Sequence, residues 1–370
     1  MVALAVRLRE QGAEVRVCAP DDDEFGKRLH GVGVPFTPIG QSVRALVTGE
    51  RRPTAAGVPE RAAALIGEQF AKLPDVAAGA DVIVAAGILP SVLGVRSVAD
   101  GLGIPYVYTA FQPTSLPSPF HPPIPRPGHP LPEGVTDNGK LWALDAENAN
   151  ALFRDALNAR RAAAGLAAVE NVRDYGFTDG PWLACDPLLA PWPDSGDLDV
   201  VQTGAWVTPD DRPLPAEVEE FLDAGDPPVY IGFGSTTPKF PDLSANFRYV
   251  VARGWAAPRP ESPRCLVVDE VNHQALFPRV SAVVHHGGAG TTTAAALAGV
   301  PQVILPQGGD QPYWGSRVEA LGIGAVGPLD DALTIALAPE TFAHAAAVAA
   351  AMYPDGALAA AQTLIEEYRP

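Results

Sequence analysis

The fold of this chain is decided by the stretch Val283-Val284-His285-His286-Gly287-Gly288-Ala289-Gly290-Thr291-Thr292-Thr293. Its two β-branched valines predict the end of a buried strand, since such residues suit the pleated surface of a sheet. The glycines that follow predict a turn, and the alanine-rich run 294–298 predicts a helix. A strand, a tight turn and a helix in this order are typical of an α/β domain.

The same turn has the chemistry of a diphosphate site. Glycines let backbone N–H groups approach an anion closely, and the first turn of a helix carries partial positive charge. His286 adds a side-chain donor beside the turn. The spacing is neither G-x-G-x-x-G nor G-x-x-x-x-G-K-[ST], so an ordinary dinucleotide site or a P-loop is disfavoured.

Length and composition indicate two domains. The 370 residues exceed one ordinary domain, and a hydrophobic share of 47% suffices for packed cores. The formal net charge of −17 argues against a nucleic-acid partner, so an anionic ligand must be held by local donors. Cys18, Cys185 and Cys265 are far apart in the sequence and indicate neither a disulfide framework nor a metal site.

The sequence predicts a cytoplasmic enzyme. Its most apolar run, 83–95, is interrupted by Gly87 and Pro90. Because it has no run of about 20 apolar residues, no membrane span is expected. The beginning of the chain lacks the charged and then apolar pattern of a signal peptide.

Helical and strand patterns alternate along the first half of the chain. The stripe of Val2, Leu4, Ala5 and Leu8 predicts a helix at the start. Strands that are apolar on both faces predict a parallel sheet covered by helices on both sides. Helices are expected at 1–11, 23–31, 59–73, 90–102 and 138–165, and strands at 14–19, 34–38, 81–86 and 105–110.

A second α/β domain follows a proline-rich linker. We expect an N-terminal domain at 1–205, the linker at 206–228 and the second domain at 229–354. A C-terminal helix at 355–370 is expected to pack back toward the N-terminal domain. In the second domain we expect a helix near 243–251 and strands at 229–233, 265–268, 282–285, 302–306 and 323–326.

Six motifs carry a resemblance to a known family. Three are Val268-Asp269-Glu270-Val271-Asn272-His273-Gln274-Ala275-Leu276-Phe277, the turn His285–Thr292, and Pro306-Gln307-Gly308-Gly309-Asp310-Gln311-Pro312-Tyr313. The shorter three are Tyr175-Gly176-Phe177-Thr178-Asp179, Gln202-Thr203-Gly204-Ala205-Trp206 and Gly232-Phe233-Gly234-Ser235. Over nearly its whole length the chain resembles the family-1 glycosyltransferases of the GT-B fold. It is most similar to the group that acts on vancomycin-type glycopeptide antibiotics.

The resemblance implies an α/β GT-B fold, in which two Rossmann-like domains face each other across a cleft. It also implies an inverting, metal-independent glycosyltransferase. Such an enzyme would move a hexose from a nucleoside-diphosphate sugar, with dTDP or UDP as nucleotide, to a hydroxyl of a natural-product acceptor such as a glycopeptide antibiotic aglycone. The nucleotide sugar is a co-substrate, and no cofactor is expected.

By the same resemblance, the C-terminal domain binds the donor. His286 would stabilise the departing diphosphate. Asp310 and Gln311 would hydrogen-bond the sugar, since a carboxylate and an amide can each bind two vicinal hydroxyls. The backbone of the turn would hold the diphosphate through Gly288, Ala289, Gly290 and Thr291.

Three further residues are implied for the nucleotide. Ser235 would contact the phosphates or the ribose, and Val271 would offer backbone groups to the base. Related plant enzymes place a stacking tryptophan where this chain has Val268. We therefore assign base stacking to Trp255.

The catalytic base is expected on an N-terminal loop that, in the family, precedes the helix at 1–11. A further family strand is also missing between the helix expected at 243–251 and Trp255. We therefore expect that the sequence omits residues of the natural polypeptide, and an intact mass of 38.6 kDa would contradict this.

The acceptor is expected on the N-terminal domain. Residues 111–139 are dense in proline and cannot form regular structure. Phe111 and Phe120 in this run, with Trp142 after it, are candidates to line the acceptor site. Because loops carry specificity on a rigid scaffold, this run predicts a large, flat, aromatic acceptor.

Two other functions stay open. A nucleotide-sugar epimerase on the same fold would turn over the donor without an acceptor. A non-catalytic donor-binding partner would bind the donor without turnover. A dehydrogenase is the weakest alternative, because the dinucleotide fingerprint is lacking.

Overall fold

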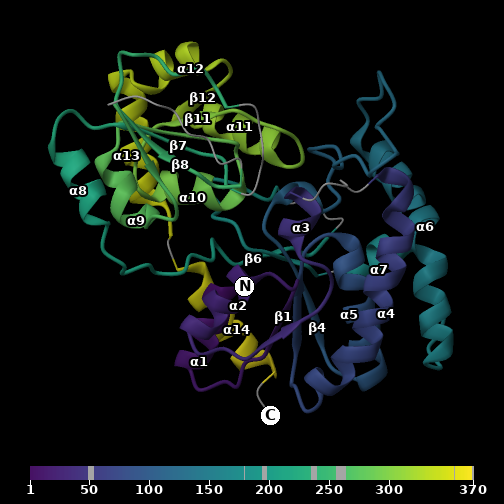
Figure 1. The fold of residues 1–370 in the computed structure, drawn as a ribbon. Coiled ribbons are helices and arrows are strands. Elements are labelled where there is room, and N and C mark those ends of the chain that lie inside the picture. The colour runs from purple at the N-terminus through teal and green to yellow at the C-terminus, as the bar shows by residue number, and fades with distance from the viewer. Residues whose placement is uncertain are drawn as a thin grey trace. The chain divides into compact units, whose positions relative to one another are not determined.

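The computed structural model describes residues 1–48, 54–178, 180–193, 198–234, 240–255, 264–353 and 355–368. The chain divides into two compact units (Figure 1). Unit 1 comprises Met1–Cys185, Pro191–Val207 and Asp355–Pro370, and unit 2 comprises Asp186–Ala190 and Thr208–Pro354. The expected linker 206–228 therefore lies almost entirely in unit 2, and the C-terminal helix lies in unit 1.

Unit 1 is built on parallel strands. They are β1 (Val17–Ala19), β2 (Phe36–Pro38), β3 (Ile83–Ala86), β4 (Tyr106–Ala110), β5 (Trp182–Leu183) and β6 (Val201–Gln202). Strands β3-β4-β5-β6 form one sheet, and β1 pairs with β2 in a second sheet. Ala86 lies opposite Thr109, so β3 and β4 end at the same edge.

Helices surround these strands. They are α1 (Val2–Glu10), α2 (Asp23–Gly31), α3 (Val43–Thr48), α4 (Val58–Ala77), α5 (Leu89–Leu102), α6 (Asn138–Ala163), α7 (Val172–Phe177) and α14 (Gly356–Tyr368), with short 3₁₀ turns at Ala55–Gly57 and Pro113–Ser115. Leu4 of α1 and Leu364 of α14 pack on Val107 and Trp182, so these two helices cover one face of the sheet.

The C-terminal helix is fixed to the first helix by an ion pair. Arg7 of α1 donates from Nε to Asp355 Oδ1 at 3.1 Å and from Nη2 to Asp355 Oδ2 at 2.8 Å. This two-bond geometry is the strong form of an arginine–carboxylate pair. Residues far apart in sequence thus complete unit 1.

Unit 2 contains one parallel six-stranded sheet. Its strands are β7 (Val229–Gly232), β8 (Tyr249–Ala252), β9 (Cys265–Val268), β10 (Ala282–His285), β11 (Gln302–Ile304) and β12 (Gly324–Val326). Their order is β12-β11-β10-β7-β8-β9. Because all strands are parallel, their carboxyl ends meet at one edge, where open α/β sheets bind ligands.

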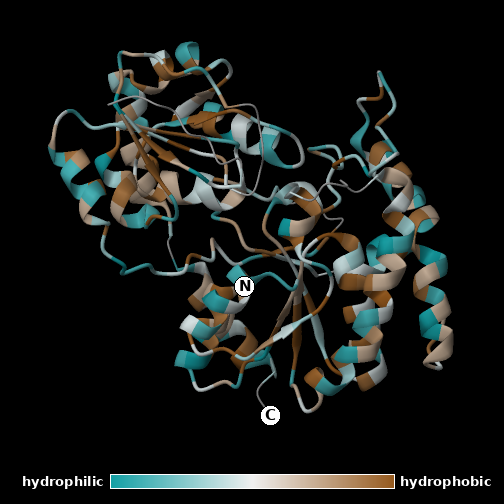
Figure 2. Cartoon of the chain, viewed as in Figure 1, coloured by the Kyte–Doolittle hydropathy of each residue, from teal (hydrophilic) through white to brown (hydrophobic). Residues whose placement is uncertain are grey.

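Two cores cover the two faces of this sheet, whose strands are mostly hydrophobic in Figure 2. Alternate residues such as Val283 and Val284 point into opposite cores, as the two-residue period of a strand requires. One core includes residues of α8 (Ala216–Asp223), α9 (His273–Leu276), the 3₁₀ turn Phe277–Arg279 and α10 (Ala289–Leu297); the other includes α12 (Leu329–Ala336). The remaining helices are α11 (Gln311–Ala320) and α13 (Pro339–Ala351).

A short excursion of the chain, Asp186–Ala190, belongs to unit 2 although its neighbours belong to unit 1. Asp186 is buried, and its carboxylate accepts from the backbone N–H groups of Leu188, Leu189 and Tyr353 at 2.9, 3.2 and 2.9 Å. Arg317 of α11 donates to Leu189 O at 3.0 Å. These bonds attach the excursion to unit 2.

The helix expected near 243–251 is wrong. Residues 249–252 form β8, and residues 240–248 contain no helix. Tyr249, Val250 and Val251 are fully buried, and aromatic and β-branched residues favour a strand between two others. The strand that seemed missing from this region is therefore present.

The helices of the described residues were compared with the length and composition of a membrane span. No individual helix there has the length and apolar character needed to cross a membrane. Only the pair α12 and α13, bent by 70°, passes that test jointly, on length and composition alone.

Candidate functional site

The turn after β10 leads into a helix whose first N–H groups face outward. Gly288 is the N-cap of α10 and supplies no capping side chain. The first helical bond runs from Thr292 N to Gly288 O at 3.0 Å, and Thr292 Oγ1 donates to the same carbonyl at 3.0 Å. The N–H groups of Ala289, Gly290 and Thr291 precede this bond and so have no partner within the helix. At the carboxyl edge of the sheet, such an arrangement can bind an anion.

Two glycines of the turn leave no room for a Cβ as the neighbouring side chains are placed. Gly287 has φ +91, and a Cβ there would lie 2.8 Å from Ile304 Cγ2. A Cβ on Gly288 would lie 2.5 Å from His286 Nε2. Glycine therefore allows the backbone to pass under the His286 ring and reach the helix start.

His285 is a structural residue, as its place at the end of the strand predicts. It is fully buried, and its Nδ1 accepts from Gly287 N at 3.1 Å. Its Nε2 therefore carries the proton and donates to Gln302 Oε1 at 3.0 Å. Burial lowers the pKa of His285 to about 3, so the ring stays neutral and rigidifies the turn.

His286 has the properties of a ligand-binding residue. Its ring is half-buried, and among the described residues its shielded Nδ1 has no hydrogen-bond partner. Burial lowers the pKa of His286, and the charge of Asp310 partly opposes that shift. A neutral imidazole with an unused polar atom can donate to a phosphate without competing with an existing bond.

Asp310 and Gln311 lie at the start of α11, beside this turn. Asp310 is the N-cap of the helix, and its Oδ2 accepts from Trp314 Nε1 at 2.8 Å. Gln311 Oε1 accepts from Gln307 N at 2.6 Å and Gly308 N at 3.2 Å. The close approach of Gly287 to Gln311 O, 3.1 Å from a built Cβ, brings the two motifs together.

The carboxyl ends of β7 and β8 form the next part of the edge. Trp255 N donates to Gly234 O at 2.9 Å, and a Cβ on Gly254 would lie 2.6 Å from the same oxygen. A Cβ on Gly234 would lie 3.7 Å from His286 Cε1, so this contact adjoins the imidazole. Ser235 lies outside the described residues.

The loop after β9 is stabilised by two polar side chains, Asn272 and Gln274, for which the sequence alone predicted no role. Val271 is buried. Asn272 caps α9 through its Oδ1, and its Nδ2 donates to Asp210 O and Arg212 O, each at 2.7 Å. Gln274 Nε2 donates to Thr208 O at 2.8 Å. The Asn-x-Gln spacing after a strand was the available signal, since asparagine is a preferred N-cap.

In unit 1, the candidate acceptor residues differ in exposure. Phe120 is 60% exposed, whereas Trp142 is only 6% exposed and offers an acceptor little surface. Trp142 Nε1 donates to His121 O at 2.9 Å. Phe111 is half-buried and packs edge-on against Trp206 at 5.6 Å between ring centroids.

The proline-dense segment is anchored to α6. Arg126 Nη2 donates to Asp145 Oδ2 at 2.8 Å, the two side chains form an ion pair, and Asp145 is 4% exposed. Asn138 Nδ2 donates to Pro119 O at 2.8 Å. His121 is half-buried, with Trp142 and Trp192 edge-on to its ring.

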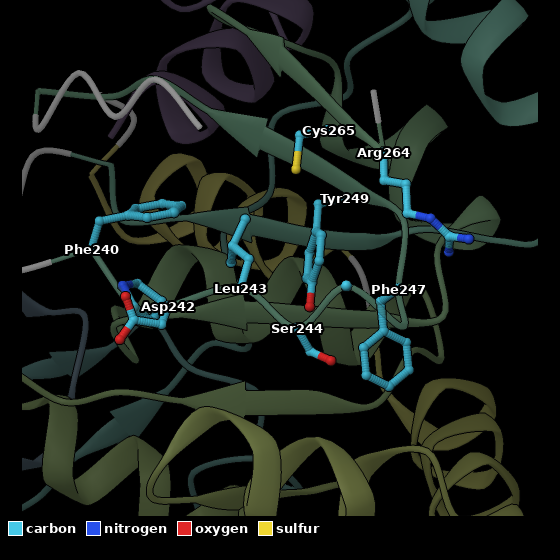
Figure 3. Close-up of a pocket in the computed structure, with 10 residues that line it drawn as sticks. Phe240, Asp242, Leu243, Ser244, Phe247, Tyr249, Arg264 and Cys265 are labelled. Carbon is cyan, nitrogen blue, oxygen red and sulfur yellow. The ribbon is translucent and has the colours of Figure 1, made fainter. Parts of the chain in front are cut away.

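A separate pocket of about 310 Å³ lies at the opposite edge of the unit 2 sheet (Figure 3). It is lined by side chains that include Phe240, Leu243, Phe247, Tyr249 and Cys265. Tyr249 and Cys265 are the first residues of β8 and β9, so this pocket is at the amino ends of the strands. Among the described residues, no group of three or more histidine, cysteine or acidic side chains is placed to hold a metal ion.

Comparison with known proteins matches both halves of the chain. Residues 1–175 match the family described as "Glycosyl transferase 4-like domain". Residues 259–364 match "Erythromycin biosynthesis protein CIII-like, C-terminal domain". Among solved structures, the glycotransferase of kitacinnamycin has a TM-score of 0.71 at 17% identity, covering 100% of this chain and 95% of that one. The glycosyltransferase VinC, solved with dTDP, has a TM-score of 0.66 at 20% identity, covering 99% and 95%.

Two relatives from Amycolatopsis orientalis are similar in sequence. Glycosyltransferase GtfE is 48% identical over 98% of this chain and 93% of that protein. Its alignment spans 386 positions, more than the 370 residues here, so GtfE has residues that this chain lacks. The vancomycin aglycone glucosyltransferase is 45% identical over 99% of this chain and 93% of that protein. The chain therefore belongs to the glycosyltransferase family of these antibiotic-biosynthesis enzymes, and it is an inverting glycosyltransferase with the GT-B fold.

Proposed function

We propose that this enzyme transfers a hexose from a dTDP- or UDP-sugar to a hydroxyl of an aromatic natural product such as a glycopeptide aglycone. The observation that carries the proposal is the convergence at one sheet edge of the uncapped start of α10, the His286 ring and the Asp310-Gln311 pair. The start of α10 and His286 match a diphosphate, and the Asp310-Gln311 pair matches the sugar attached to it.

The leaving group is stabilised by neutral donors. As the sugar departs, negative charge develops on the diphosphate, and the helix N-terminus and His286 are oriented toward it in advance. In a chain of net charge −17, such local donors hold the anion without a general positive field. The reaction then needs neither a metal ion nor a resident cofactor.

The nucleotide follows the strand order of the sheet. From the diphosphate at β10, the sequence β10-β7-β8-β9 leads past Trp255 to the loop that carries Val271. Backbone groups of Val271 would bind the base, Trp255 would stack on it, and Ser235 would contact the phosphates or ribose. The complex of VinC with dTDP supports thymine as the base.

The acceptor is bound by unit 1. Phe120 is an exposed aromatic side chain on the anchored proline-dense segment, and Phe111 follows β4 at the carboxyl edge of its sheet. Trp142 supports this segment by donating from Nε1 to His121 O, next in sequence to Phe120. A flat aromatic scaffold fits such side chains, and the names of the relatives point to glycopeptides.

Calorimetric titration tests the donor site. We expect dTDP to bind the wild type, and His286→Ala to weaken that binding by about 1.5–3 kcal/mol, the range for a hydrogen bond to a charged group. His344→Ala is the matched control. This exposed histidine lies beside Gly322, near the amino end of β12, whereas the proposed donor site is at the carboxyl edge of the sheet. Unchanged affinity in His286→Ala would remove His286 from the diphosphate site. A parallel titration with UDP identifies the preferred base.

Turnover separates the three functions. Dependence of dTDP release from dTDP-glucose on added vancomycin aglycone supports transfer. Donor turnover without acceptor supports an epimerase, and tight donor binding without any turnover supports a binding partner. Failure of both nucleotides to bind contradicts the proposal as a whole.

A further inference from the structure

The carboxylate of Asp310 is held by a tryptophan one helical turn later. Trp314 Nε1 donates to Asp310 Oδ2 at 2.8 Å, and the Trp314 backbone N donates to Asp310 O at 3.3 Å. Residues four apart lie on the same helix face, so both bonds join consecutive turns of one stripe. Asp310 thus uses one of its two carboxylate oxygens within the protein.

Trp314 itself has no freedom to move. It is 1% exposed, and its ring lies edge-on to Tyr313 at 5.4 Å between centroids. The next residue, Gly315, is so close to the sheet that a Cβ there would lie 2.7 Å from Val326 Cγ2. Close packing on both sides fixes the indole, and the indole fixes the carboxylate.

Within the residues that the structure describes, the side chain of Gln311 has its oxygen, not its nitrogen, engaged. Its Oε1 accepts the N–H groups of Gln307 and Gly308, which leaves the amide nitrogen as the group that can face a ligand. Within the described part of the chain, Asp310 Oδ1 accepts no hydrogen bond. The start of α11 therefore presents one acceptor, Asp310 Oδ1, and one donor, Gln311 Nε2.

We propose that Trp314 is a positioning residue for Asp310, and that Asp310 and Gln311 bind one sugar oxygen each, with opposite polarity. Asp310 Oδ1 accepts from a hydroxyl of the donor sugar, and Gln311 Nε2 donates to another oxygen. This differs from the sequence expectation that each side chain binds two vicinal hydroxyls. The inference rests on the proposed function, since it assumes that these residues face the sugar.

The polarity defines a substrate class. The sugar position facing Asp310 must carry a free hydroxyl, because only a hydrogen-bond donor satisfies a carboxylate oxygen. The position facing Gln311 tolerates a methyl ether, whose oxygen still accepts. A donor sugar lacking the hydroxyl at the Asp310 position leaves a desolvated carboxylate and is rejected more strongly.

The test compares the affinities of dTDP and dTDP-glucose by calorimetry, or of the uridine pair if UDP is preferred. We use the ratio Kd(dTDP)/Kd(dTDP-glucose), whose change on mutation reports the sugar contacts because the nucleotide contacts are common to both ligands. Trp314→Phe keeps the ring and removes the N–H. We expect the dissociation constant of dTDP to stay unchanged and that of dTDP-glucose to rise about fivefold. The ratio Kd(dTDP)/Kd(dTDP-glucose) then falls about fivefold, the equivalent of about 1 kcal/mol.

Trp206→Phe is the matched control. It also removes an indole N–H that donates to an oxygen, here Thr203 Oγ1 at 3.0 Å, but in unit 1. We expect its ratio to equal that of the wild type. A decrease in Trp206→Phe as large as in Trp314→Phe would show a general effect of losing a tryptophan and would overturn the inference.

A double-mutant cycle distinguishes positioning from a structural role. In the Asp310→Ala background, Trp314→Phe should cause no further loss of the ratio, because the carboxylate it orients is gone. Loss by the same factor in both backgrounds overturns the inference. Normal dTDP binding with an unaffected ratio in Trp314→Phe also overturns it, while the proposed function stands. Absence of nucleotide binding in the wild type instead contradicts the proposed function.

A second measurement needs no change at Trp314, in case Trp314→Phe does not fold. The chain has six tryptophans, so ¹⁵N-tryptophan labelling gives six indole resonances. We expect Asp310→Ala to accelerate solvent exchange of one of them, whose N–H has lost its acceptor. Unchanged exchange at all six would contradict the bond on which the inference depends.

Discussion

Gly287 and Gln311 meet so closely that a Cβ built on Gly287 would lie 3.1 Å from the carbonyl oxygen of Gln311. The contact joins the turn after β10 to the first residue of α11. It couples the backbone geometry of the groups proposed to bind the phosphates to that of the groups proposed to bind the sugar. A change at either residue is therefore felt by both groups.

Replacing Gly287 should damage the fold and the site together. Gly287→Ala must place a Cβ at φ +91 and 2.8 Å from Ile304 Cγ2. We expect the free energy of unfolding to fall by about 2–4 kcal/mol, measured by urea denaturation, and dTDP affinity to fall at least tenfold. The control is Gly31→Ala in α2, where a Cβ meets nothing within 4 Å. Equal denaturation midpoints for both variants would contradict the crowding.

Donor affinity should increase as the pH falls. Burial holds the pKa of His286 below its usual value near 6.5, and a bound diphosphate raises it, so binding takes up a proton. The affinity should therefore rise from neutral pH down to the pKa of the free enzyme. The only charged side chain acting on the ring in the described structure is Asp310. Calorimetry with dTDP-glucose is the measurement, because its diphosphate diester does not titrate in this range.

His286→Gln is the variant for this experiment. Glutamine retains an N–H donor but cannot take up a proton. Its affinity should stay flat between pH 5.5 and 7.5, a window set by the ordinary pKa near 6.5. The same pH dependence in wild type and His286→Gln would assign the proton to another group.

His285 should make the protein less stable in acid. Its pKa is about 3 when folded, so below the unfolded value near 6.5 the unfolded chain binds the extra proton. Stability from neutral His285 is present above pH 6.5 and is lost, by up to about 1.4 kcal/mol per pH unit, as the pH falls toward 3. Urea unfolding of wild type and His285→Gln at several pH values measures the difference. Parallel curves would show that His285 does not titrate on unfolding.

Removing the Asp310 carboxylate should separate turnover from nucleotide binding. We expect Asp310→Ala to reduce kcat by about 10²-fold, as for other groups that orient the reacting part of a substrate, and to leave dTDP affinity nearly unchanged. In the proposed site, Asp310 binds the sugar, while α10 and His286 hold the diphosphate. Asp331→Ala, on the exposed side of α12, is the control. Equal losses of turnover and dTDP affinity would contradict the assignment.

Exchanging residues 111–139 with those of a relative should change acceptor choice and leave donor choice intact. The inserted segment must retain an arginine at position 126, because Asp145 of α6 is 4% exposed and would otherwise be buried without its partner. Competition assays with paired acceptors and with dTDP- and UDP-glucose measure both choices. A shift in donor preference would show that the segment contributes to the other site.

Much of the fold could be predicted from local patterns. The strand Ala282–His285 has the expected bounds, because its apolar run is followed by a glycine turn. The strand Cys265–Val268 also agrees. Residues 249–252 were misassigned, since the preceding polar and proline-containing run masked a short buried strand.

The site residues were recognised through motifs, but their hydrogen bonds depend on tertiary contacts. Trp314 lies just beyond the quoted motif, and its role needs a rotamer that only packing fixes. Asn272 and Gln274 bind carbonyls about 60 residues earlier in the chain, a relationship that no local pattern contains. The roles of the donor and acceptor residues, and the cytoplasmic location, stay predictions.

The excursion Asp186–Ala190 limits how this enzyme can be recombined. A gene fragment encoding only residues 208–354 would lack the carboxylate that accepts the Tyr353 N–H and the carbonyl that accepts from Arg317. Two polar groups of unit 2 would then lose their partners. Chimeric enzymes that exchange sugar specificity should therefore transplant two separate pieces of sequence, and the smaller piece is five residues long.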